Sequence, residues 1–179
     1  MLAIYKRELK SYLTSMVGYL FMFFVLLIAG IYFSAYQLSA AYPKFEYTLN
    51  AMTFVFLIAV PILTMRVLAE ERKQKTDQLL LTSPVNITGI VVGKYLAAFV
   101  VYMIGVSCTI LFQIILATFA TPDWNVFLGN YLALALIGAA LIAIGIFISS
   151  LTENQIVAAI GTFAITLFIW MFDTLASVL

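Results

Sequence analysis

The chain has 179 residues, of which 65% are hydrophobic and 9% are charged, and its mean hydropathy is +1.13. An ordinary soluble domain has about 25% charged residues, so this composition excludes a water-soluble globular protein. The net charge of +1 gives no reason to expect nucleic-acid binding. The absence of histidine and the single cysteine, Cys108, exclude the usual zinc sites and histidine-dependent catalytic triads.

Residues 1–15 predict an amphipathic helix that lies in the membrane interface, with basic residues near anionic lipid headgroups. A frayed tail that only sets the orientation of the protein is the alternative. A cleaved signal peptide fits poorly, because Glu8 interrupts the basic stretch and the apolar run 16–33 exceeds the usual ~7–15 residues. The apolar residues at helical spacing are Leu2, Tyr5, Leu9, Tyr12, Leu13 and Met16.

Five long apolar stretches follow, and each can supply the ~20 residues that a helix needs to cross a bilayer. Strand-length alternation of polar and apolar residues is missing, so an all-α polytopic bundle is predicted. Pro61 in the second span predicts a kink, which is either static or a hinge. The third span exceeds one bilayer crossing and is expected to tilt or project. The predicted spans are 17–37, 49–68, 88–118, 127–149 and 155–175.

The distribution of charge predicts the orientation. With the N-terminus inside, eight of the nine basic residues fall on the inner side and only Lys44 falls outside, which is a strong positive-inside bias. The inner residues are Lys6, Arg7, Lys10, Arg66, Arg72, Lys73, Lys75 and Lys94.

The polar segment 69–87 joins the second and third spans on the inner side. Its first part is charged and cannot lie in hydrocarbon. A short helix is predicted after it, capped by Thr76, favoured by Asp77 in its first turn, and ended by Ser83 and Pro84. Two interpretations of its leucines remain open: they insert into a partner protein, or they lie in the membrane interface. These residues are Leu79, Leu80 and Leu81.

The order of these elements resembles the permease subunits of type-2 ABC exporters, and the resemblance covers nearly the whole chain. A second piece, 149–155 followed by a span with Trp170, is similar to the gliding-motility-associated and nitrous-oxide-reductase-maturation branches. The residues that carry the first match are Glu70, Glu71, Arg72, Thr76, Leu79, Leu80, Ser83, Pro84, Val85, Gly93 and Lys94.

This resemblance implies a transport subunit, with no catalytic site of its own, that works as a homodimer or heterodimer in a prokaryotic plasma membrane. Separate cytoplasmic ABC ATPase subunits would bind ATP and Mg²⁺. Segment 69–87 would couple their closure to the bundle, through polar contacts of Glu70, Glu71 and Arg72 and through the leucines. Because the family usually has six spans, either the C-terminus is truncated or this branch has lost its last helix, and an end within an apolar stretch favours truncation.

The sequence agrees with ATP hydrolysis on another chain. Thr88 lies five residues before Gly93, where a P-loop has its first glycine, and Tyr95 follows Lys94, where a P-loop has serine or threonine. Two other functions remain as alternatives. A passive channel would conduct ions without any partner, and a membrane scaffold would recruit a cytosolic protein without a nucleotide-dependent change in access.

A few residues within the spans are candidates for the transport pathway or for helix packing. Gln113 is polar without charge, and Asp173 is the one acid of the last span. Gly89 and Gly93 allow close helix approach, as does the ridge formed by Ala135, Ala139 and Ala143. No two carboxylates are predicted to share a depth in the membrane, so no acid/base pair is expected.

Overall fold

The computed structural model describes residues 2–39, 46–73, 87–118 and 123–178. No strand occurs within these ranges, and the prediction of an all-α bundle is confirmed. The helices are α1 (Leu2–Thr14), α2 (Met16–Phe33), the π-helix η1 (Ser34–Ser39), α3 (Glu46–Thr64), α4 (Ala69–Lys73), α6 (Ile87–Cys108), α7 (Ile110–Ala117), α8 (Trp124–Leu151) and α9 (Gln155–Val178).

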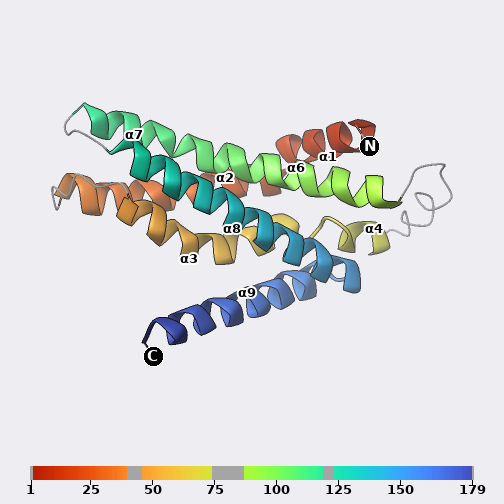
Figure 1. Ribbon diagram of the computed structural model, residues 1–179. Coiled ribbons are helices and arrows are strands. Elements are labelled where there is room, and N and C mark those ends of the chain that lie inside the picture. Colours follow the sequence, from red (N-terminus) through yellow and green to blue (C-terminus); the bar gives the residue numbers. More distant parts are fainter. Residues whose placement is uncertain (1, 40–45, 74–86, 119–122, 179) are drawn as a thin grey trace.

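Five helical segments are long and apolar enough to cross a membrane, as predicted: Met16–Ser39, Tyr47–Lys73, Thr88–Ala117, Trp124–Leu151 and Gln155–Phe172. Successive segments run in opposite directions along the bundle (Figure 1). One end of the bundle therefore contains α4, and we call it the α4 end. The opposite end contains α7, and we call it the α7 end.

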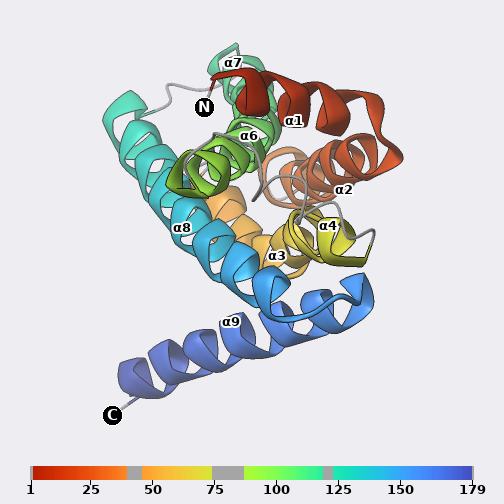
Figure 2. The ribbon, with the colours of Figure 1, turned by 90° about the vertical axis from the view of Figure 1, so that its right-hand side faces the viewer.

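The centre of the bundle is α3, which packs against α2, α8 and α9 (Figure 2). More than half of the most apolar part of its span is buried. By contrast, α9 lies on the outside and contacts mainly α8 and α3. Its buried face consists of small side chains, Ala158, Thr162 and Thr166, while most of its large apolar side chains up to residue 172 are exposed. Such exposed apolar surface is expected where helices face lipid.

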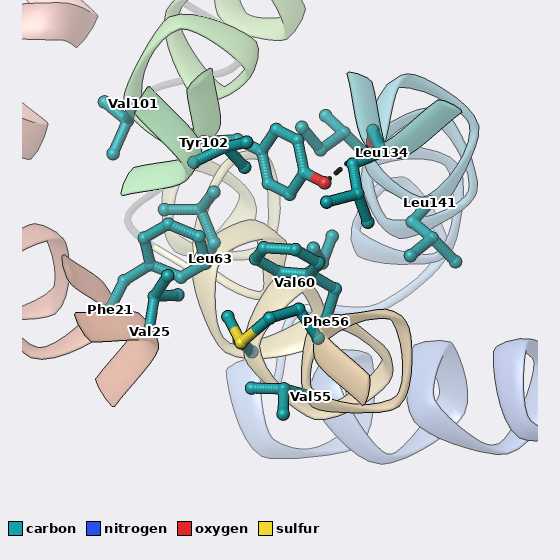
Figure 3. Close-up of a cluster of buried hydrophobic side chains, with 14 of the residues drawn as sticks. Phe21, Val25, Val55, Phe56, Val60, Leu63, Val101, Tyr102, Leu134 and Leu141 are labelled. Atoms are coloured by element: carbon teal, nitrogen blue, oxygen red, sulfur yellow. Dashed lines mark hydrogen bonds between the residues drawn. The ribbon is translucent and has the colours of Figure 1, made fainter. Parts of the chain in front are cut away.

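Aromatic rings fill the middle of the core, around the buried side chain of Tyr102 (Figure 3). The ring of Phe56 lies edge-on to it at 4.8 Å, and that of Phe21 lies 6.4 Å away. The hydroxyl of Tyr102 donates a hydrogen bond to the carbonyl of Leu134 at 2.8 Å. A buried tyrosine needs such a partner, so this contact joins α6 to α8 at low cost.

Two glycines of α8 allow its neighbours to approach closely. A Cβ atom at Gly138 would overlap the ring of Tyr102, and one at Gly145 would overlap the side chain of Thr64 in α3. In the alanine ridge predicted on this helix, Ala135 and Ala139 are half-buried and Ala143 is exposed. Gly138 and Gly145, seven residues apart, leave the space that these two side chains occupy, and we call these two positions the notches of α8.

Two of the spans are interrupted. In the second, α3 ends at Thr64, three residues after Pro61, and a turn over residues 65–68 leads into α4. In the third, the helix breaks at Thr109, between α6 and α7. The first of these interruptions contains Arg66 and directly precedes the charged helix α4.

Candidate functional site

The turn 65–68 leaves backbone groups of the second span without helical partners, as any helix end does. Ser149 of α8 supplies three of the missing hydrogen bonds. Its hydroxyl oxygen accepts from the amides of Leu68 and Ala69 and donates to the carbonyl of Met65, each at 3.1 Å. Ser149 is itself fully buried. The position of the turn is therefore fixed by a side chain 80 residues further along the chain.

Lys94 of α6 supplies another hydrogen bond to the same turn. It lies seven residues into α6, about 10 Å from the helix start, and its side chain is only 1% exposed. The ammonium donates to the carbonyl of Val67 at 2.8 Å. It also lies 2.8 Å from Glu71 and 3.4 Å from Glu8. A buried ammonium requires acceptors of this kind, and each of its three N–H donors has one.

Arg7 closes these contacts into a ring of alternating charge. Its guanidinium lies 3.0 Å from the carboxylate of Glu8 and 3.4 Å from that of Glu71. We call Arg7, Glu8, Glu71 and Lys94 the four-charge ring. It is electrically neutral and joins α1, α4 and α6. Glu8 and Glu71 both contact the ammonium of Lys94.

The other described charges of the turn 65–68 and of α4 lie outside this ring. Arg66 and Glu70 form an i,i+4 ion pair at 2.8 Å, with about a third or less of each side chain exposed. Arg72 and Lys73 are exposed at the end of α4. They directly precede the part of segment 69–87 that the structure does not describe.

Tyr12 attaches the other end of α1 to the bundle. Its side chain is buried, and its hydroxyl donates to the carbonyl of Leu63 in α3 at 3.2 Å. Burial, and then the nearby carboxylate of Glu8, raise the pKa of Tyr12 far above its ordinary value. The hydroxyl therefore remains protonated and remains a donor at physiological pH.

The six apolar residues expected on one face of the N-terminal helix separate into two groups. Tyr5, Leu9 and Tyr12 pack against the core. The others are exposed: Leu2 by 70%, Leu13 by 38% and Met16 by 80%. Only this second group is free to contact lipid, so the helix serves the protein core as well as any interface.

The five spans agree with the comparison to known families. Residues 31–178 match the model of the ABC-2 family transporter protein. The chain belongs to this family. It is therefore an ABC transporter permease and a multi-pass membrane protein of the transport class. No curated protein and no solved structure matches it.

The predicted site residues of this ABC-2 permease fall into two groups. The described ones, Glu70, Glu71 and Arg72, lie together in α4, where Glu71 faces Lys94 and Arg7. Their contact with an ATPase remains a prediction. The others lie outside the described residues: Thr76, Asp77, Leu79, Leu80, Leu81, Ser83 and Pro84.

The candidates within the spans are separate from this end. Gln113 is buried in α7, and its side-chain oxygen has no hydrogen-bond partner among the residues that the structure describes. Gly93 is buried and Gly89 is half-buried in α6. Asp173 belongs to α9, but its side chain lies outside what the structure describes. Their roles in transport or packing remain predictions.

Sequence reasoning missed the ion pair of Glu8 with Lys94 and the hydrogen bonds of Ser149 to the turn 65–68. Lys94 had a detectable signal, because a lysine seven residues inside an apolar span needs a buried partner. Glu8 had a weaker one, as the only acid among the basic residues that precede the first span. Nothing in the sequence pairs the two, since they are 86 residues apart.

Proposed function

We propose that this ABC-2 permease moves its substrate with ATP that separate cytoplasmic ABC ATPase subunits bind, with Mg²⁺, and hydrolyse. Segment 69–87 is the contact with the ATPase, and the bundle works with a second permease copy. The N-terminus and the α4 end lie in the cytoplasm of a prokaryotic cell, and the direction of transport is export. The resemblance to type-2 exporters and the positive-inside bias support these assignments.

The observation that carries the proposal is the anchoring of α4. The turn before α4 is held by Ser149 and Lys94, and α4 itself is held through Glu71. A segment that begins from such a fixed point transmits a push to the helices that hold it. A segment attached only by a loose loop would absorb the same push.

The two exposed cations that end α4 suit contact with an acidic surface of the ATPase. Arg72 and Lys73 are solvent-facing, whereas the acids of α4 have partners within the permease. The leucines that follow provide the apolar part of the contact. In such a contact the polar residues fix how the permease and the ATPase are oriented, and the burial of apolar side chains supplies most of the binding affinity.

The proposal is tested by replacing Leu79 and Leu80 with aspartate and co-expressing the permease with its ABC ATPase. We expect loss of co-purification and loss of the ATPase activity that the permease stimulates. Leu79→Met with Leu80→Met is the matched control, because it keeps the apolar volume. Unchanged co-purification and unchanged stimulation in a folded aspartate variant would refute the coupling role.

The same preparation separates the two alternative functions. ATPase binding without any nucleotide-dependent change in the accessibility of the bundle would indicate a scaffold. Ion flux through liposomes that contain the permease alone would indicate a channel. The proposed function predicts neither result.

A further inference from the structure

Three side-chain hydrogen bonds that involve tyrosine join α6 to α8. In two of them a tyrosine hydroxyl of α6 donates to a backbone carbonyl of α8, and in the third a serine hydroxyl of α6 meets a tyrosine hydroxyl of α8. Hydrogen bonds between helices stabilise their pairing in a membrane. We call these contacts the tyrosine seam, and they favour movement of α6 and α8 as one unit. The pairs are Tyr95 with Ala139 at 3.2 Å, Tyr102 with Leu134 at 2.8 Å (Figure 3), and Ser107 with Tyr131 at 2.7 Å.

The tyrosine seam ends just before the third span breaks. Ser107 is its last residue on α6, and the break at Thr109 follows two residues later. The hydroxyl of Thr109 donates to the carbonyl of Val106, and such local bonds often bend a helix. Beyond the break, the ring of Phe112 in α7 lies 5.2 Å from that of Phe33 in α2. A contact between two phenyl rings is apolar, so it fixes α7 less strictly than the seam fixes α6.

The short helix α7 also contains a buried polar group that is not satisfied where it lies. Gln113 is only 2% exposed, and its side-chain oxygen has no hydrogen-bond partner among the described residues. An unpaired buried acceptor is costly, so it raises the free energy of the observed position of α7. A movement of α7 that brings this oxygen to water or to a donor removes that cost. Gln113 therefore brings the observed and the moved positions closer in free energy than an apolar side chain would.

We propose that α7 is a hinged segment, which turns about Thr109 when the ATPase binds nucleotide, while α6 stays attached to α8 through the tyrosine seam. The side-chain oxygen of Gln113 gains a hydrogen bond in the turned position. This inference rests on the proposed function. It adds that only the last part of the third span moves relative to α8, at the end of the bundle opposite α4.

The substitution Gln113→Leu separates this role from a purely structural one. It replaces the unpaired amide with an apolar side chain of similar size, so the observed position of α7 becomes more favourable. A residue with only a structural role would lose stability and activity together. Here we expect an equal or higher melting temperature with a lower activity. Ile114→Leu is the matched control, because Ile114 is an exposed apolar residue of the same helix.

The experiment uses the complete complex of permease and ATPase in liposomes, in a Cys108→Ala background. Nitroxide labels are attached in pairs to cysteines at exposed positions. Leu111→Cys with Leu151→Cys spans α7 and α8, and Leu96→Cys with Leu128→Cys spans α6 and α8. Pulsed EPR measures each distance without nucleotide and with Mg·ATP trapped by vanadate.

In the parent and in the Ile114→Leu control, we expect the distance between α7 and α8 to change when nucleotide is trapped. The distance between α6 and α8 should stay the same. In Gln113→Leu the change should be reduced or lost, and the stimulated ATPase activity should fall about fivefold or more, which matches the lower end of the cost of an unpaired buried group. If Gln113→Leu does not fold, Gln113→Met replaces it, because an unbranched methionine adapts to the space that it fills.

Three results would overturn the inference. The first is a distance between α7 and α8 that stays constant, or that changes together with the distance between α6 and α8, since the span then does not turn at Thr109. The second is a Gln113→Leu variant that matches the control in distance and activity. The third is a loss of activity accompanied by a lower melting temperature. Failure of the proposed function would appear separately, as unchanged stimulation in the Leu79→Asp, Leu80→Asp variant.

Discussion

The two ends of the bundle each contain an interrupted span, and they are held in different ways. At the α4 end, the turn 65–68 is held by Ser149 and Lys94, which come from other helices. At the α7 end, the break at Thr109 is held locally, since its hydroxyl donates to the carbonyl of Val106 at 2.6 Å. The first interruption therefore depends on tertiary contacts, and the second depends on its own helix.

The two ends also differ in the polar groups that they contain. The α4 end contains the four-charge ring and the ion pair of Arg66 with Glu70. The α7 end contains neutral groups, such as the pair of Gln37 and Thr48 at 3.0 Å, while the side-chain oxygen of the buried Gln113 has no partner. Substitutions that remove these contacts at the α4 end should therefore cost stability, and replacement of Gln113 at the α7 end should not.

The largest effect is expected for Lys94→Met. It removes the buried ammonium and leaves two largely buried carboxylates and the carbonyl of Val67 without their common donor. Loss of one partner of a buried ion pair costs about 3–5 kcal/mol. Thermal unfolding in detergent, followed by size-exclusion chromatography, measures the cost. Lys73→Met, at an exposed position, is the control, and equal melting temperatures of the two variants would break the comparison.

Ser149→Ala should have the next largest effect. It orphans two amides and one carbonyl in the turn 65–68, and unpaired buried groups cost about 1–3 kcal/mol. The neighbouring Ser150→Ala is a close control, because the hydroxyl of Ser150 bonds only to Phe147 of its own helix, at 2.6 Å. The melting temperature should fall for the first variant only. A similar fall in both would mean that Ser149 does not hold the turn.

Gly145→Ala and Gly129→Ala sharpen the comparison along a single helix. At the α4 end of α8, a methyl group at Gly145 meets Thr64, and such overpacking costs about 1–3 kcal/mol. Near the α7 end, a methyl group at Gly129 meets nothing within 4 Å. There alanine should stabilise the helix, by about 1 kcal/mol at most. Opposite shifts in melting temperature are expected, and shifts of the same sign would contradict this packing.

The smallest effect is expected for Gln113→Leu. Replacing a buried, unpaired acceptor by an apolar side chain of similar size is neutral or slightly stabilising. The same unfolding assay should therefore give an equal or higher melting temperature. A clear decrease would mean that Gln113 is satisfied in the folded protein and belongs to a polar contact at the α7 end.

Most of the fold could be predicted because membrane spans depend on local sequence. Uncharged stretches of sufficient length must be helical in lipid, and the helices α8 and α9 begin and end within three residues of the predicted spans. The break at Thr109 was not predictable, since neither glycine nor proline marks it. The notches at Gly138 and Gly145 were missed because spacing alone does not tell which face of a helix meets its neighbours.

The candidate site was less predictable because it depends on contacts between distant residues. Glu70, Glu71 and Arg72 were found as a charged group that must lie outside hydrocarbon, and they do form one short helix. That Glu71 faces inward to Lys94 follows only from the packing of α4 against the bundle. Likewise, a serine near the end of α8 gives no local sign that it holds a turn on another span.

The central claim is that the α4 end faces the cytoplasm, where an ATPase can reach it. Single cysteines introduced by Lys73→Cys and by Asn125→Cys in a Cys108→Ala background place the two ends, since both positions are exposed. With a membrane-impermeant maleimide, we predict labelling of position 125 in intact cells. Position 73 should react only in inside-out vesicles. Labelling of position 73 in intact cells would contradict the account.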